Sequence, residues 1–182
     1  SIRKPYGNDS IKYEQDLMQR YSSGELTSAD SIHFPDSLKT FTKRLGRPVY
    51  GGGGIIPDVF VPIDTTKATD FFIKCNKKAT TMRFASAMFD KYRTALAGID
   101  DFSKLETYLE SISLESQFLD YASRVDGIKP KAGEWEESRS YMMPQINARV
   151  GRYSKLDEEA FYRFYMPIDD TIKEALENTY SI

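Results

Sequence analysis

From about residue 65 onward, the apolar residues recur at steps of three and four positions, the spacing of one face of an α-helix. The longest such series predicts a helix from about residue 80 to residue 96, and its apolar stripe consists of Met82, Phe84, Ala85, Met88, Phe89, Tyr92 and Leu96. The same spacing predicts helices over residues 65–76, from Asp100 or Asp101 onward, and over 114–125, 134–150, 155–165 and 168–180. Residues 65–182 are therefore expected to form an all-helical domain.

Residues with strong backbone preferences set the expected ends of these helices. Thr65 or Thr66 is a candidate cap for the first helix, because a hydroxyl at a helix start can accept from an unpaired backbone N–H. Gly127 is expected to end the helix before it. Pro144 lacks a backbone N–H, so it is expected to kink or split the helix over residues 134–150.

Residues 1–64 follow a different pattern, since they contain seven of the 11 glycines and five of the 8 prolines. A short helix is expected to end at about Tyr21. Short extended pieces are expected to end at Val49-Tyr50 and to cover Ile55-Ile56 and Val59–Val61, where β-branched residues gather around Pro57. A proline cannot donate to a strand ladder, so this strand belongs at a sheet edge or is interrupted by turns. The expected fold class is mainly α (α+β), with a short β-containing part followed by the helical domain.

Composition and charge exclude several classes of function. The 182 residues include 27 acidic and 25 basic side chains, and this balance provides no electrostatic case for binding nucleic acid or an anionic membrane. No run of about 18 apolar residues predicts a membrane span. His33 and Cys75 are the single residues of their types, which excludes a zinc site built from Cys and His and any internal disulfide.

Few side chains are candidates for chemistry. His33 lies in a polar, turn-rich stretch, where an ordinary surface role is the favoured interpretation. Cys75 lies between Lys74 and Lys77, which could lower the pKa of its thiol, but a helix residue half buried against the core is the favoured interpretation. Four carboxylate pairs stand at or near expected helix starts, where capping explains them better than a metal does: Asp100-Asp101, Glu136-Glu137, Glu158-Glu159 and Asp169-Asp170. No metal or cofactor site is predicted.

Four consecutive glycines, Gly51, Gly52, Gly53 and Gly54, form the most unusual local feature. A phosphate-binding loop would have to open a helix and carry a Lys-Ser or Lys-Thr pair, whereas this run leads into Ile55-Ile56-Pro57. A tight turn or a bulge between two extended pieces is therefore the favoured interpretation.

Aromatic and basic residues are concentrated near the carboxyl end. The aromatic ones are Tyr153, Phe161, Tyr162, Phe164 and Tyr165, and the nearby basic ones are Arg149, Arg152, Lys155 and Arg163. Such a mixture could form a stacking platform for nucleic acid. The interleaved Asp157, Glu158 and Glu159 argue against that function and favour a helical core or a protein docking face.

At SIRKPYG and at VYGGGGIIPDVFVPID, the sequence resembles the carboxyl-terminal processing (tail-specific) serine proteases, in particular their large Bacteroidetes-type members. The family's Gly-Gly-Ile-x-Pro-Asp segment is matched by Gly53-Gly54-Ile55-Ile56-Pro57-Asp58. Its preceding strand ends in a Gly-Arg-Ser-Ile-Gln-like stretch, and this chain begins as if cut inside it. SSGELTSADSIHFPDSLKT resembles an insertion of those members, and the helical part resembles their C-terminal extension more weakly.

The resemblance implies a parent protein that hydrolyses peptide bonds near the carboxyl ends of protein substrates, with a Ser nucleophile and a Lys general base. Neither catalytic pattern of the family occurs in this chain, so no residue here inherits a catalytic role. Gly51, Gly52, Gly53, Gly54, Pro57 and Asp58 inherit a structural role at the edge of the protease core. The implied location is the periplasm or cell envelope of a Gram-negative bacterium, and no cofactor is implied.

The resemblance thus predicts an inert C-terminal fragment, with residues 1–64 as the end of the protease core and residues 65–182 as a helical domain for core packing, self-association or partner binding. Strands cut from their sheet leave unpaired edges, so we expect either pairing between chains, as in a homo-oligomer, or disorder over residues 1–50. Two alternatives remain. One is a free-standing helical interaction module with a Gly-rich linker, and the other is an independent hydrolase that uses His33.

Overall fold

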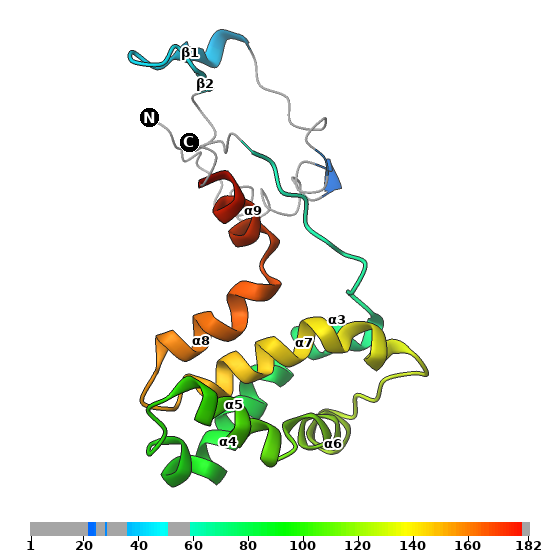
Figure 1. Cartoon of the computed structure of the whole chain (residues 1–182). Coiled ribbons are helices and arrows are strands. Elements are labelled where there is room, and N and C mark those ends of the chain that lie inside the picture. The colour runs from blue at the N-terminus through cyan, green and yellow to red at the C-terminus, as the bar shows by residue number, and fades with distance from the viewer. Residues whose placement is uncertain (1–21, 25–27, 29–35, 51–58, 180–182) are drawn as a thin grey trace, which may run out of the picture. The chain divides into compact units, whose positions relative to one another are not determined.

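The computed structural model describes residues 22–24, 28, 36–50 and 59–179, and the protein is mainly helical in these ranges (Figure 1). The chain divides into two compact units, Ser1–Asp64 and Thr65–Ile182. Each unit has its own structure and is described separately.

The first unit contains a small antiparallel hairpin. The 3-10 helix η2 (Asp36–Leu38) leads into β1 (Lys39–Phe41), which pairs with β2 (Pro48–Tyr50) so that Thr40 lies opposite Val49. The turn between the strands is closed by a hydrogen bond of 3.0 Å from the Gly46 N–H to the Thr42 carbonyl oxygen, and Gly46 has a left-handed φ of 59°. The extended piece expected to end at Val49-Tyr50 is confirmed.

One strand prediction in this unit is wrong. Residues 59–61 are not a strand, although Val59–Val61 carries the β-branched residues that favour one. Pro62 follows directly and cannot donate a backbone bond, and the described hairpin pairs only residues 39–41 with 48–50. β-propensity without a partner strand is insufficient to form a ladder. The expected helix ending at Tyr21 and the piece at Ile55-Ile56 lie outside the described residues.

The second unit consists of seven α-helices within the described residues. They are α3 (Asp70–Lys77), α4 (Thr80–Leu96), α5 (Phe102–Ser111), α6 (Leu114–Asp126), α7 (Glu134–Gly151), α8 (Glu158–Tyr165) and α9 (Asp170–Thr179), with the 3-10 helix η3 (Met166–Ile168) between the last two. The all-helical expectation for this part is confirmed. Helix α7 is central, because α3, α4, α5 and α8 all pack on it (Figure 1).

Local signals explain most helix ends. The Asp101 carboxylate accepts from the Lys104 N–H at 3.0 Å and caps α5, and Gly127 adopts a φ of 66° and ends α6 as expected. The first helix begins later than predicted, since Thr69, and not Thr65 or Thr66, is its cap. The Thr69 hydroxyl accepts from the Phe72 N–H at 3.3 Å and lies 2.6 Å from the Ser138 hydroxyl of α7, a tertiary contact that the sequence pattern does not reveal.

Pro144 does not split α7, which runs unbroken from Glu134 to Gly151. A proline inside a helix costs about 3 kcal/mol. Met142 and Ile146 on either side of it are buried, and burial of two such side chains contributes about 3–6 kcal/mol. Tertiary packing therefore offsets the local cost and keeps the helix continuous.

An aromatic cluster forms the centre of the helical core. The ring of Phe118 contacts those of Phe71, Phe84 and Trp135, with centroid separations of 6.3, 5.3 and 6.1 Å. These residues belong to four different helices, α6, α3, α4 and α7, and all four are buried. Edge-on and tilted ring pairs of this kind stabilise a core beyond the area that they bury. The cluster therefore ties together helices that are far apart in sequence.

Gly151 lets α7 approach its neighbours closely. A Cβ atom at this position would lie 3.1 Å from Leu105 Cδ2 and 3.2 Å from Phe164 Cε2, which is tighter than ordinary side-chain contact. The absence of a side chain therefore brings α5 and α8 against the end of α7. A polar link adds to this packing, because the Lys155 N–H donates to the Ile99 carbonyl oxygen at 3.0 Å.

A carboxylate ties α6 to α7. Glu115 Oε1 accepts from Trp135 Nε1 at 2.8 Å, and Glu115 Oε2 accepts from Arg139 Nε at 2.7 Å. The Arg139 guanidinium is the main reason that the pKa of Glu115 lies below its usual range, and the Trp135 indole adds to the effect. Arg139 thus holds the Glu115 carboxylate in place, and the carboxylate in turn orients the buried Trp135 indole through its hydrogen bond.

Ala79, which precedes α4, adopts a left-handed conformation with φ 51° and ψ 34°. This conformation costs an L-residue about 1–2 kcal/mol of strain, which glycine does not incur. Glycine lowers the free energy of unfolding by about 0.5–1 kcal/mol for a different reason, because its unfolded chain has more conformational freedom. We therefore expect Ala79→Gly to raise the free energy of unfolding by about 0.5–1 kcal/mol. Chemical denaturation followed by circular dichroism measures the change.

Ala97 provides the matched control, because it caps the other end of α4 in a right-handed conformation, φ −62° and ψ −16°. Ala97→Gly relieves no strain and is expected to lower the free energy of unfolding by up to about 1 kcal/mol. Equal losses for the two glycine variants would contradict the strain argument.

Candidate functional site

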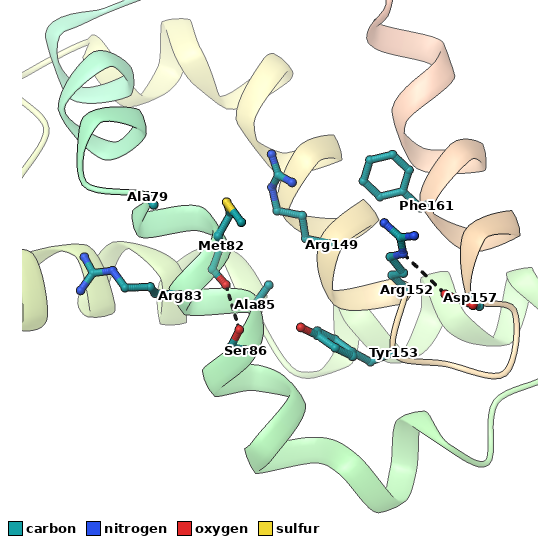
Figure 2. A pocket seen from close by; sticks show the side chains of 10 residues that line it. All are labelled: Ala79, Met82, Arg83, Ala85, Ser86, Arg149, Arg152, Tyr153, Asp157 and Phe161. Atoms are coloured by element: carbon teal, nitrogen blue, oxygen red, sulfur yellow. Dashed lines mark hydrogen bonds and ion pairs between the residues drawn. The ribbon is translucent and has the colours of Figure 1, made fainter.

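Three segments of the helical unit line an open groove with a volume of about 600 Å³ (Figure 2). The segments are the start of α4, the end of α7, and the turn and first residues of α8. The lining residues are Ala79, Met82, Arg83, Ala85, Ser86, Arg149, Arg152, Tyr153, Asp157 and Phe161. The groove therefore combines three guanidinium groups with one carboxylate and a set of apolar side chains. We call it the α4–α7–α8 groove.

The α4 side of the groove is held by Asp126, whose side chain is 5% exposed. Its Oδ2 accepts from the Thr80 hydroxyl at 2.6 Å, its Oδ1 pairs with Arg83, and its backbone carbonyl oxygen accepts from Lys78 Nζ at 2.9 Å. The Thr80 hydrogen bond first, and then the Arg83 guanidinium, hold the pKa of Asp126 below its usual range. Arg83 is thereby fixed at the rim with its charge already offset.

The α7–α8 side of the groove is held by Arg152. Its Nη2 lies 2.7 Å from Glu158 Oε1 and its Nε lies 3.5 Å from Asp157 Oδ1, and its guanidinium lies over the Phe161 ring at 5.5 Å. Asp157 has a left-handed φ of 45° with ψ −115°, which ends the preceding turn. Helix α8 therefore begins at Glu158, and the start predicted near residue 155 is wrong.

Arg149 differs from the other arginines of the helical unit. Within residues 65–179, Arg83, Arg93, Arg124, Arg139, Arg152 and Arg163 each pair with a carboxylate. Arg149 makes no such pair in this range, and its Nε is buried with no hydrogen-bond partner. Figure 2 shows its side chain extending from α7 between Met82 and Phe161. A buried donor without a partner is uncommon and points to a missing one.

The aromatic and basic residues expected to form one cluster divide into separate contacts. Tyr153 stacks on Phe89 of α4 with a centroid separation of 4.4 Å, whereas Phe164 packs on Phe102 of α5 at 4.7 Å. Phe161 stacks on Tyr165 at 5.5 Å. Two of these contacts join separate segments of the chain and the third lies within α8, so the rings do not form one continuous stacking surface.

Cys75 is fully buried, so the half-buried position expected for it is wrong. Burial raises the pKa of its thiol to about 11, outweighing the hydrogen bond with Thr80, which acts in the opposite direction. The thiol is therefore protonated at neutral pH, and the alternative of a lowered pKa between Lys74 and Lys77 is also wrong.

Three of the four carboxylate pairs have structural partners, and the fourth, Glu136-Glu137, lies in the first turn of α7. The Asp101 carboxylate caps α5, and Asp169 Oδ1 accepts from the Thr171 N–H at 3.0 Å at the start of α9. Glu158 and Glu159 pair with Arg152 and Arg163. Across the described ranges, no three His, Cys, Asp or Glu side chains gather in a geometry that could hold a metal ion.

The remaining sequence candidates, His33, Gly51, Gly52, Gly53, Gly54, Pro57 and Asp58, lie outside the described residues. In the part of the chain that is described, no helix is both long and apolar enough to cross a membrane. Comparisons with models of protein families, with curated proteins and with solved structures found no match for this chain.

The groove is not apparent in the sequence, because its lining residues do not form a motif. Met82 was expected in the buried stripe of its helix, yet its side chain is 60% exposed at the groove. Arg149 was grouped with the neighbouring basic residues, and nothing in the sequence separates an arginine with an acidic partner from one without. An exposed methionine beside such an arginine is visible only once α4 and α7 are packed together.

Proposed function

We propose that this chain is the non-catalytic C-terminal region of a carboxyl-terminal processing serine protease, and that its helical unit binds the protease core of the same protein. The segment Gly53–Asp58 matches the family's motif at the end of that core, which supports the assignment at the level of sequence. The parent protein cleaves proteins near their carboxyl ends in the periplasm or cell envelope. The chain itself contributes binding surface, and self-association into a homo-oligomer is compatible with this role.

The observation that carries the proposal is the apolar face of α9, which is not buried in the described structure. Ile172, Ala175 and Leu176 follow the spacing of one helix face, yet none of the residues of α9 is buried, and Leu176 is 48% exposed. A helix of 10 residues is too short to be stable in water through its own hydrogen bonds. An amphipathic helix of this length therefore needs a partner surface for its apolar face.

The protease core is the partner that the sequence favours. The residues that resemble the end of that core precede the helical unit in the same chain, so the core and α9 are held at a high effective concentration by covalent linkage. Binding within one chain requires no additional protein.

The longer protein, with the coding sequence that precedes Ser1, provides the test. We expect that coding sequence to contain a Ser-Lys dyad region, and we expect the longer protein to hydrolyse an unstructured protein substrate while the 182-residue chain does not. Replacing Ile172 and Leu176 with aspartate should lower the thermal midpoint of the protease core in the longer protein by several degrees, because two charges would enter an apolar contact.

Thr171→Asp is the matched control, since it adds one carboxylate to the exposed first turn of the same helix, where the helix dipole accommodates it. Its thermal midpoint should stay within about one degree of the parent value. A coding sequence without the dyad region would refute the assignment to the protease and favour a free-standing helical interaction module. A dyad region together with an unchanged midpoint in the double variant would refute the contact of α9 with the core.

A further inference from the structure

We propose that the α4–α7–α8 groove binds an acidic segment of another protein, with a side-chain carboxylate of that segment paired to Arg149 and an adjacent apolar side chain lying on Met82 and Phe161. The groove uses α4, α7 and α8, whereas the proposed contact with the protease core uses α9. The two proposals are therefore independent, and either one can be refuted without affecting the other.

The unpaired guanidinium of Arg149 identifies the ligand as an anion. Arginine is always charged in proteins, and a charged group in a partly buried position is stabilised by a paired and hydrogen-bonded anion. Arg149 has a buried Nε with no acceptor, while the six other arginines of residues 65–179 have carboxylate partners. The charge of Arg149 thus lacks a partner anion, which an incoming group can supply from the groove, although the buried Nε atom itself is out of a ligand's reach.

The charges around the groove favour a carboxylate over a phosphate. Arg83 is offset by Asp126, and Arg152 faces both Asp157 and Glu158, so Arg149 provides the one cationic group with no acidic partner among the described groove residues. A carboxylate carries one negative charge and fits the guanidinium through two parallel hydrogen bonds. A phosphate monoester carries nearly two charges, and Asp157 would repel the second.

The apolar lining favours a carboxylate that stands next to an apolar side chain. Met82 is 60% exposed on one side of the Arg149 side chain, and Phe161 lies on the other side (Figure 2). A methionine thioether adapts to irregular partners and makes favourable contacts with aromatic rings. An aromatic side chain that neighbours the carboxylate would cover this exposed methionine.

The open shape of the groove favours a protein segment over a small molecule. Small-molecule sites cover most of the surface of their ligand. Here the lining residues Met82, Ser86, Arg152 and Asp157 are exposed, so a small ligand would stay largely in water. A peptide can extend past both ends of the groove and gain contacts along its length.

Fluorescence anisotropy with the full chain tests the proposal. The probe is a fluorescein-labelled peptide of sequence Ser-Gly-Phe-Asp-Gly-Ser with an amidated end, and the matched probe carries Asn in place of Asp. We expect the Asp peptide to bind at least about tenfold more tightly than the Asn peptide, because the amide cannot form the charge-assisted pair. The same peptide with phosphoserine in place of Asp should bind more weakly than the Asp peptide.

Arg149→Gln should reduce the affinity for the Asp peptide about tenfold and should remove the difference between the two peptides. Arg163→Gln is the matched control, because Arg163 pairs with Glu159 on α8 and does not line the groove, and its affinity should be unchanged. Met82→Glu tests the site by changing an exposed residue, so the core packing is not altered. It places a carboxylate beside Arg149 from an exposed position and should abolish binding of the Asp peptide.

Equal affinity for the Asp and Asn peptides, or full binding by Met82→Glu, would overturn the assignment of the groove to a carboxylate. Tighter binding of the phosphoserine peptide would overturn the choice of a carboxylate over a phosphate. Binding of free 3-phenylpropionate as tight as that of the Asp peptide would overturn the assignment to a protein segment. Circular dichroism of each variant verifies that the comparison is made on folded protein.

Discussion

Replacing Phe118 with alanine is expected to lower the free energy of unfolding of the helical unit by about 3–5 kcal/mol, the range typical of a buried Phe→Ala change. The side chain is 0% exposed, and its ring contacts Phe71, Phe84 and Trp135 from three other helices. Alanine would remove both the burial of the ring and its aromatic contacts. The resulting cavity would lie where four helices meet, so no single helix can move to fill it.

Urea denaturation followed by Trp135 fluorescence and by circular dichroism measures this loss, because Trp135 is the single tryptophan and belongs to the same cluster. Phe41→Ala is the matched control, since that side chain is 64% exposed on β1, and we expect it to change the free energy of unfolding by less than about 1 kcal/mol. A loss of less than about 1 kcal/mol for Phe118→Ala would contradict the central role of the aromatic cluster.

Replacing Asp126 with asparagine is expected to lower the free energy of unfolding by about 1–3 kcal/mol at pH 7. The carboxylate is nearly inaccessible to solvent, accepts from Thr80, and pairs with Arg83. Thr80 is fully buried, so its hydroxyl has no solvent to replace a lost acceptor. Asparagine keeps the shape of the side chain but removes the charge, and it brings an NH₂ group against donors.

Asp120→Asn on the same helix is the matched control. Asp120 pairs with Arg124, but both side chains are largely exposed, and an exposed pair of this kind contributes less than about 1 kcal/mol. The difference between the two asparagine variants in urea denaturation isolates the effect of burial. Equal losses for both would show that the Asp126 contacts add nothing beyond a surface ion pair.

The stability difference between the parent chain and Asp126→Asn should also depend on pH. The folded-state pKa of Asp126 is lowered relative to the unfolded value of about 3.9, so its charged form stabilises the fold above that pH. This contribution is present at neutral pH and is lost as the pH falls below about 4 and through the folded-state pKa. The stability difference between the parent chain and Asp126→Asn should therefore be constant between about pH 5 and pH 7 and shrink below about pH 4. A constant difference down to pH 2 would contradict the lowered pKa.

Periodic spacing in the sequence was sufficient to predict the helical class and several helix bounds. The helix over residues 80–96 was predicted with its observed bounds, because an amphipathic stripe of that length has few alternative ways to bury itself. Gly127 marked the end of α6, and Asp101, one of two candidate starts with Asp100, marked the start of α5, because capping and left-handed turns depend on one residue and its immediate neighbours. Such signals are local, so they can be recognised in the sequence without knowledge of the fold.

Predictions failed where a distant residue decided the outcome. Thr69 caps α3 in place of Thr65 or Thr66 while its hydroxyl lies against Ser138, and Pro144 is tolerated because its neighbours are buried by other helices. Val59–Val61 has strand propensity but no partner strand in the described hairpin. In the first two cases a tertiary contact outweighed the local preference of the chain. In the third, the local preference had no tertiary contact to support it.

The sequence by itself therefore determined that the described part of the second unit consists of helices and where most of these helices begin and end. It also showed that the chain carries one histidine and one cysteine. Helix spacing and capping are properties of neighbouring residues, so the linear order contains them. Only the tertiary structure decided that Cys75 is buried with a raised pKa, that Met82 is exposed, and that Arg149 lines the groove without an acidic partner. These properties depend on which side chains meet across helices, and that pairing is set by the packing of the whole core.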